Sequence, residues 1–174
     1  MKRHAIEIKL NRIEQLFNSM DPSPFHERDL DHDAEEFIVN WARELPSKAE
    51  LTLKIYLHEW PSQDPTAMIS SAAHHFFDYR LGMLHMEFKF LMRQARTSLF
   101  VGLSFLTLCL ITANFLLPYR EAVWLHIMRE SLTIVGWVAM WRPINMYLYD
   151  WWPLHRKIKV FRKLSQMEVQ ISQS

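Results

Sequence analysis

Three polar side chains lie in the apolar second half of the sequence, where a charged group is costly and therefore suggests a site. Arg142 and Asp150 fall in one apolar segment and Asn114 in another. An arginine at the centre of a bilayer costs at least ~2.5 kcal/mol unless it is paired or hydrated. Asp150 lies about 80° around a helix from Arg142 and is an imperfect partner. These residues predict an intramembrane polar site; the alternative is an arginine that snorkels beside a proline kink.

Acidic residues and histidines in the first half offer the other candidates for chemistry. The acidic cluster 29–33 lacks the glycine and the glutamate that an EF-hand needs at its sixth and twelfth positions. His74 and Asp78 share a helix face but supply only two of the ligands that zinc requires. Capping of the following helix explains the acidic cluster better. We therefore predict no metal site, no cofactor, no catalytic residue and a non-enzymatic protein.

A basic segment, HRKIKVFRK at 155–163, follows the second apolar segment. Beside a bilayer, each basic residue contributes about 1 kcal/mol of attraction to anionic lipid. The net charge of the chain is only +1, so no general attraction to nucleic acid is expected. We predict that anionic membrane lipids, and not nucleic acid, are the partner of this segment. Its lipid-facing cations are Arg156, Lys157, Lys159, Arg162 and Lys163.

Two apolar segments must position these groups. Residues 98–117 carry no charge, and at about 1.5 Å per residue they span roughly 30 Å, the thickness of the hydrocarbon core. We predict a second spanning helix at 131–152, kinked at Pro143. The alternative is a span over 122–141, followed by an interfacial stretch at 144–152.

The flanks of these segments predict their orientation. Four Lys and Arg residues lie between 80 and 96, and five lie between 156 and 163. The connection 118–130 has two, each followed by a glutamate. Because cytoplasmic flanks carry the excess of basic residues, both chain termini are expected in the cytoplasm and the connection in the periplasm.

Alternating patterns predict a small α/β head on the cytoplasmic side. Residues 4–10 and 51–57 alternate apolar and polar side chains, as half-buried strands do. Because a two-stranded sheet is marginal, the alternation at 167–172 predicts a third strand that returns to this sheet; the alternative is a frayed tail. A helix at 34–45 lies between the first two strands, with Asp33 as its cap. Its expected apolar stripe is Phe37, Ile38, Trp41, Ala42 and Leu45.

A second helix is predicted to run without interruption from 65 to 117. Asp64 can cap it, Pro65 suits its first position, and the next proline is Pro118. Apolar residues on it keep a 4-3-4-3 spacing, which is a heptad seam. The partner of this seam is either the chain's own segment 154–164 or a second copy of the protein. The seam residues are Phe77, Leu81, Leu84, Phe88, Leu91 and Ala95.

The predicted fold is an α+β membrane protein, with a two-helix transmembrane hairpin, a long cytoplasmic helical extension and a small head of two or three strands. The function predicted is homo-oligomerisation or service as an accessory or scaffold subunit of a membrane complex. The alternative is a transport or channel component built around Arg142. The predicted segments are the head 1–64, the stalk 65–97, the first span 98–117, the connection 118–130, the second span 131–152 and the basic segment with its strand 153–174.

Two stretches of the sequence resemble motifs of a group of uncharacterised bacterial inner-membrane proteins with two transmembrane helices. The first is DPSPFHERDLD at 21–31, followed by AEEF at 34–37. The second is GWVAMWRP at 136–143, followed by LYDWWP at 148–153. The resemblance implies a multi-pass protein of the bacterial inner membrane. It implies no activity and assigns no site residue.

Overall fold

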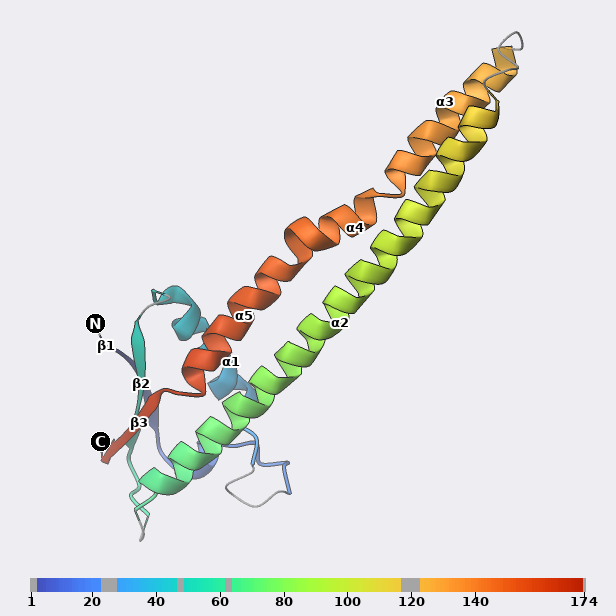
Figure 1. The fold of residues 1–174 in the computed structure, drawn as a ribbon. Helices are drawn as coiled ribbons and strands as arrows, with labels where there is room; N and C mark the ends of the chain where they lie inside the picture. The colour runs from blue at the N-terminus through green and yellow to red at the C-terminus, as the bar shows by residue number, and fades with distance from the viewer. Residues whose placement is uncertain (1–2, 23–27, 47–48, 62–63, 117–122, 174) are drawn as a thin grey trace. The chain divides into compact units, whose positions relative to one another are not determined.

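The chain forms two compact units in the computed structural model, which describes residues 3–22, 28–46, 49–61, 64–116 and 123–173 (Figure 1). Unit 1 comprises Met1–His85 and Arg156–Ser174, and unit 2 comprises Met86–His155. The described residues are mostly helical, with one small parallel sheet and one long apolar helix. Unit 2 is therefore an insertion into the chain of unit 1.

Unit 1 contains a three-stranded parallel sheet in the order β1-β2-β3. The strands are β1 (Arg3–Leu10), β2 (Glu50–Leu57) and β3 (Glu168–Gln173). All three predicted strands are confirmed, including the one at the end of the sequence. The central strand β2 thus pairs on one side with the first residues of the chain and on the other with the last.

The two faces of the sheet differ in polarity. Ile6, Leu53 and Val169 stand in register on the inner face, and all three are buried. Glu7 and Lys54 stand in register on the outer face. Since side chains alternate along a strand, the predicted period of two produces this division.

Helix α1 (His32–Glu44) covers the inner face of the sheet with Ile38, which is fully buried. Its cap is Asp31, whose carboxylate accepts a hydrogen bond from the backbone N–H of Asp33 at 3.0 Å. The predicted cap, Asp33, is wrong, because the helix begins two residues earlier than the apolar pattern indicates. A short 3-10 helix, η1 (Ile13–Leu16), precedes it.

Helix α2 (Thr66–Phe115) confirms the predicted long helix. Asp64 caps it: one of its carboxylate oxygens accepts hydrogen bonds from the Thr66 hydroxyl at 2.6 Å and from the Thr66 backbone N–H at 2.9 Å. The hydroxyl and then the backbone donor lower the pKa of Asp64 from its ordinary value of 3.8. The ionised carboxylate therefore stabilises the start of α2.

This cap makes the stability of unit 1 depend on pH. Because the folded pKa of Asp64 is lowered, its contribution is complete above about pH 3.8 and is lost as the pH falls through the lower value. We expect Asp64→Asn to lose less stability than the wild type between about pH 6 and pH 2.5. The urea midpoint, followed by circular dichroism, measures this. Thr66→Val, which keeps the backbone donor, should show an intermediate slope; equal slopes in all three proteins would contradict the assignment.

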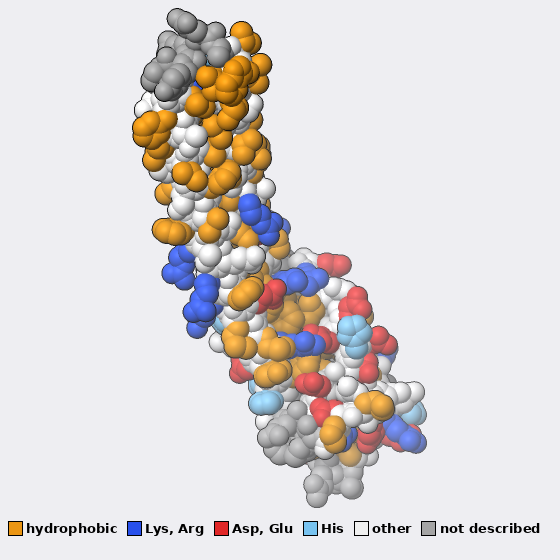
Figure 2. Space-filling view, turned by 90° about the vertical axis from the view of Figure 1, so that its right-hand side faces the viewer, with side chains coloured by type: hydrophobic (Ala, Val, Ile, Leu, Met, Phe, Trp, Pro, Cys, Tyr) orange, Lys and Arg blue, Asp and Glu red, His pale blue; other side chains and the backbone are white. Residues whose placement is uncertain are grey.

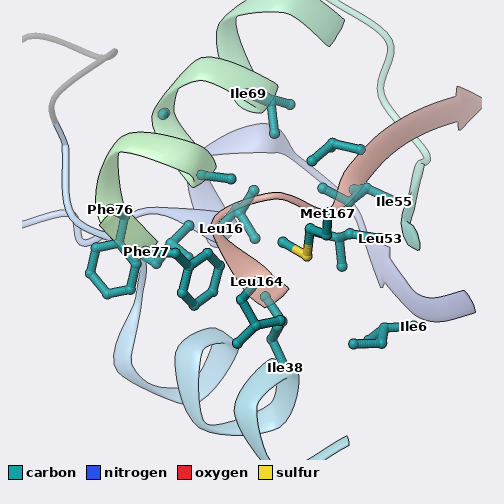
Figure 3. Close-up of a cluster of buried hydrophobic side chains, with 14 of the residues drawn as sticks. Ile6, Leu16, Ile38, Leu53, Ile55, Ile69, Phe76, Phe77, Leu164 and Met167 are labelled. Carbon is teal, nitrogen blue, oxygen red and sulfur yellow. The ribbon is translucent and has the colours of Figure 1, made fainter. Parts of the chain in front are cut away.

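Helix α5 (Trp151–Leu164) brings the chain back to the sheet. Within unit 1, Phe161 of α5 packs against Phe77 of α2, with ring centroids 6.1 Å apart. Nε2 of His74 lies 2.7 Å from the carbonyl oxygen of Met167, which can only accept, so this nitrogen carries the proton. Figure 3 shows the core where α1, α2, α5 and the sheet meet. Its labelled side chains are Ile6, Leu16, Ile38, Leu53, Ile55, Ile69, Phe76, Phe77, Leu164 and Met167.

Unit 2 contains the rest of α2, then α3 (Val123–Val138), α4 (Trp141–Asn145) and the π-helical turn η3 (Met146–Asp150). The predicted helix over 131–152, kinked at Pro143, is instead three helical pieces, with an interruption at 139–140. Helix α3 begins inside the stretch predicted as the connection, and its limits follow the alternative of a helix within 122–141.

The interruption lies at 139–140, one turn before the expected kink at Pro143. Proline has no N–H to donate to the carbonyl four residues earlier, and its ring also clashes with that carbonyl. The affected carbonyl belongs to Ala139, so the helix breaks there. A new helix, α4, then begins at Trp141 and contains Pro143.

Candidate functional site

Within unit 2, α2 and α3 pack through a seam of mostly small residues. The buried residues of α2 beyond Ser98 are Gly102, Leu106, Cys109 and Ala113. A Cβ placed on Gly136 of α3 would lie 2.9 Å from Cδ1 of Leu106 and 3.1 Å from Cβ of Cys109. The two helix backbones therefore approach closely at Gly136, as helix pairs with small interface residues do.

Gly102 allows a similarly close approach between α2 and the interrupted backbone at 139–140. A Cβ on Gly102 would lie 3.3 Å from both the Ala139 carbonyl oxygen and Sδ of Met140, and 3.5 Å from Cγ of Pro143. The glycine thus lets the interrupted backbone at 139–140 lie directly against α2. Sequence reasoning ended the seam at Ala95 and missed these residues. The signal was present, because Ala95, Gly102 and Cys109 are small residues spaced by seven.

The outward surface of this helix pair is apolar and consists of large side chains. In Figure 2 hydrophobic side chains cover much of the visible face of unit 2, while acidic side chains gather on unit 1. Among the described residues, α2 is the one helix long and apolar enough to cross a membrane, and 22% of its most apolar window is buried. From Leu99 to the end of α2, the large exposed apolar residues are Leu99, Phe100, Val101, Leu103, Phe105, Leu108, Leu110, Ile111 and Phe115.

The same surface continues along the returning chain. Large apolar side chains are exposed from the start of α3 to the start of α5, beyond the interruption at 139–140. A pair of helices in water would bury such residues against each other and expose the small ones. In unit 2 the large apolar residues are exposed and the small residues are buried between the helices. The exposed members are Val123, Trp124, Ile127, Met128, Ile134, Val135, Trp137, Val138, Trp141, Ile144, Tyr147, Leu148, Tyr149 and Trp152.

The three predicted intramembrane polar residues do not form one cluster. Arg142, Asp150 and Asn114 are all exposed, and no hydrogen bond or ion pair among the described residues links any two of them. Pro143, next to Arg142, packs near Gly102. Asn114 lies twelve residues farther along α2, about 18 Å away along the helix axis. The packing of the helix pair therefore separates Asn114 from Arg142.

The predicted partner seam divides between the two units. Phe77 is fully buried against Phe161, so of the two partners left open by the sequence, the chain's own segment is the one seen here. Leu81 and Leu84 are half-buried and pack at the margin of the same core. The remaining three predicted seam residues lie in unit 2: Phe88 and Leu91 are half-buried, and Ala95 is buried.

The basic residues of α5 lie opposite its buried side. Ile158 and Phe161 are buried, whereas Lys163 is half-buried and donates from Nζ to the Pro46 carbonyl oxygen at 2.8 Å. Desolvation by burial lowers the pKa of Lys163. The other four predicted lipid-facing cations are exposed: Arg156, Lys157, Lys159 and Arg162.

An exposed aromatic pair on α1 was not expected. Phe37 and Trp41 were predicted in the apolar stripe of this helix, but they are 42% and 46% exposed. Their ring centroids lie 6.2 Å apart. Ile38, Val39 and Ala42 take the buried side of α1 instead. The pair is therefore an apolar patch on the surface of unit 1.

The candidate metal ligands have structural roles. His74 holds the carbonyl of Met167, and Asp31 caps α1. The described residues contain no group of three or more His, Cys, Asp or Glu side chains placed to hold a metal ion.

Comparison with known proteins adds no relative. No family model matches the chain, and no curated protein or solved structure is similar to it. The resemblance to bacterial inner-membrane proteins with two transmembrane helices thus stays a prediction.

Proposed function

We propose that the chain is a non-enzymatic integral membrane protein of the bacterial inner membrane that acts by assembly. Unit 2 is its transmembrane hairpin, and unit 1 is a cytoplasmic head that docks onto a second copy or onto another subunit of a membrane complex. The observation that carries the proposal is the pairing of β3 with β2. These two strands lie on either side of unit 2 in the sequence, and the helix pair of unit 2 exposes large apolar side chains.

This pairing supports a hairpin with two crossings. Strands β2 and β3 are hydrogen-bonded in one sheet, so residues before and after unit 2 lie on one side of any bilayer. If α2 crosses, the chain must cross back. Helix α3 alone has 16 residues, about 24 Å. The exposed apolar surface continues to Trp152, so the returning crossing extends through α4 and η3.

The distribution of exposed cations supports the orientation. Arg93 and Arg96 are exposed just before the apolar part of α2, and four cations of α5 are exposed just after the returning segment. Basic residues at these positions favour the cytoplasmic side and attract anionic lipids. Both termini are therefore placed in the cytoplasm by the proposal.

The aromatic pair on α1 supports assembly. Phe37 and Trp41 expose apolar area on unit 1, outside the predicted spans. Aromatic side chains of this kind dominate the energy of protein interfaces. A head that only anchored the chain would not need such a patch.

The test is the mass of the purified protein in lipid nanodiscs. We expect two or more copies, or a stoichiometric second subunit. Phe37→Ser combined with Trp41→Ser should reduce this mass to that of one chain. Trp60→Ser removes another partly exposed aromatic residue of unit 1 and serves as the control. A wild-type particle with one chain and no partner would refute assembly.

A further inference from the structure

Two hollows lie along one flank of the helix pair in unit 2, and Phe105 lines both of them. The first has a volume of about 390 Å³ and is lined by Gln94, Thr97 and Ser98 at one end. The second has a volume of about 360 Å³ and lies between α2 and α3, beside Leu108. The two hollows follow one another along α2 and share Phe105. We call the pair of hollows the flank groove.

The two ends of the flank groove differ in chemistry. At the first end, the side-chain hydroxyl of Ser98 makes no hydrogen bond to another described residue, and Gln94 is exposed. Thr97 donates to the Arg93 carbonyl oxygen at 3.1 Å, which leaves its own oxygen free to accept. At the other end the hydroxyl of Thr112 donates to the Leu108 carbonyl oxygen at 2.9 Å. The other end also has hydroxyl groups, those of Thr112 and Ser131, but only the Gln94 end is lined by an exposed residue with a side-chain amide, which can both donate and accept.

The length of the apolar part matches one leaflet of a bilayer. Ten residues separate Ser98 from Leu108, which is about 15 Å along the helix. The hydrocarbon core of a bilayer is roughly 30 Å thick, so each leaflet contributes about half of this. An acyl chain that begins beside Ser98 would therefore reach the bilayer midplane near Leu108, passing Val101 and Phe105.

The charge around the polar end indicates an anionic headgroup. Lys89, Arg93 and Arg96 are exposed on the turns of α2 near Gln94, and Arg142 is exposed next to Pro143, which packs near Gly102. Long basic side chains of this kind bind phosphate through charge-assisted hydrogen bonds. In a symmetric pair of chains joined at this groove, Arg93 and Arg96 would instead face their own copies.

We propose that the flank groove binds one anionic phospholipid, with its phosphate at Gln94 and Ser98 and one acyl chain along Val101, Phe105 and Leu108. This inference rests on the proposed membrane insertion and goes beyond general attraction of lipids to the basic segment. The bound lipid fills the recess beside the interruption at 139–140 and completes the outer surface of the hairpin.

Native mass spectrometry of the protein released from nanodiscs tests this site. With equal amounts of phosphatidylglycerol and phosphatidylcholine of identical acyl chains, we expect one retained phosphatidylglycerol, enriched about tenfold, the ratio that ~1.4 kcal/mol produces. Val101→Trp should fill the groove and abolish the adduct. Leu103→Trp is the control, since Leu103 is a similarly exposed residue of α2 that does not line the groove.

The outcomes separate this inference from the proposed function. A protein that carbonate releases from membranes overturns both. A protein that stays embedded but retains the two lipids equally, or keeps its adduct in Val101→Trp, overturns the lipid site alone. Loss of a second chain instead of a lipid in Val101→Trp would show that another copy occupies the groove, and it too overturns the lipid site.

Discussion

Truncation of the chain after Gln166 is expected to unfold unit 1. The truncation removes β3 together with Met167, and it exposes the second edge of β2. Met167 is 2% exposed and Val169 is 9% exposed. Full burial of such a side chain is worth about 1.5–3 kcal/mol, so the two together contribute about 3–6 kcal/mol. This loss is comparable to the whole stability of a marginal domain, about 5 kcal/mol.

Urea unfolding followed by circular dichroism, together with limited proteolysis, measures this loss. Removal of Gln173 and Ser174 alone is the control, because it leaves the buried side chains of β3 in place. The truncated protein should show no cooperative transition for unit 1. Equal midpoints for the truncated and control proteins would show that the sheet does not need β3, and the argument that both ends share one side would lose its basis.

Gly136→Leu is expected to separate α2 from α3. The added side chain would begin 3.1 Å from Cβ of Cys109, in a seam that has no space for it. Overpacking of this kind costs about 1–3 kcal/mol. We therefore expect a large decrease in the SDS concentration that unfolds unit 2 in mild detergent. Far-ultraviolet circular dichroism reports the transition.

Gly82 offers a matched control on the same chain, because a Cβ there would meet nothing within 4 Å. Gly82→Leu should leave the SDS transition in place. With alanine the two positions should also differ: Gly82→Ala stabilises its helix by about 0.5–1 kcal/mol, whereas Gly136→Ala gains less than this or loses stability. If Gly136→Leu behaved like Gly82→Leu, the close packing of α2 and α3 would be wrong.

Local patterns predicted the elements of this fold well. The alternation at 4–10, 51–57 and 167–172 is a direct consequence of one buried sheet face, so all three strands were found. That the third strand returns to the sheet of the first two was also predicted, but the strand order and the parallel register were not, because a pair such as Leu53 and Val169 joins residues more than a hundred positions apart. Short-range patterns carry no information about that distance.

The errors have physical causes. The helix break was expected at Pro143. However, the absence of a backbone N–H on Pro143 and the clash of its ring both affect the carbonyl of Ala139, one turn earlier. Phe37 and Trp41 were placed in the core because apolarity was taken for burial, although they lie at the margin of the stripe led by Ile38. The seam at Gly136 was missed for the opposite reason, since small residues contribute little to an apolar pattern.

The grouping of the three predicted polar residues was also wrong, because local sequence patterns do not show which residues of different helices lie close together. Arg142, Asp150 and Asn114 were grouped because each is a polar residue in an apolar segment. Their grouping assumed that the two helices bring them to one level. In the structure the segment around Arg142 lies against Gly102, so Asn114 is about 18 Å away along α2.

Cysteine labelling across the membrane tests the central claim most directly. In a Cys109→Ser background, single cysteines are placed at the exposed positions Lys9, Ser172 and His126. A membrane-impermeant maleimide is then applied to right-side-out and inverted inner-membrane vesicles. The two-crossing hairpin predicts that Lys9 and Ser172 react only in inverted vesicles and His126 only in right-side-out vesicles. Reaction of His126 from the same side as Ser172 would contradict it.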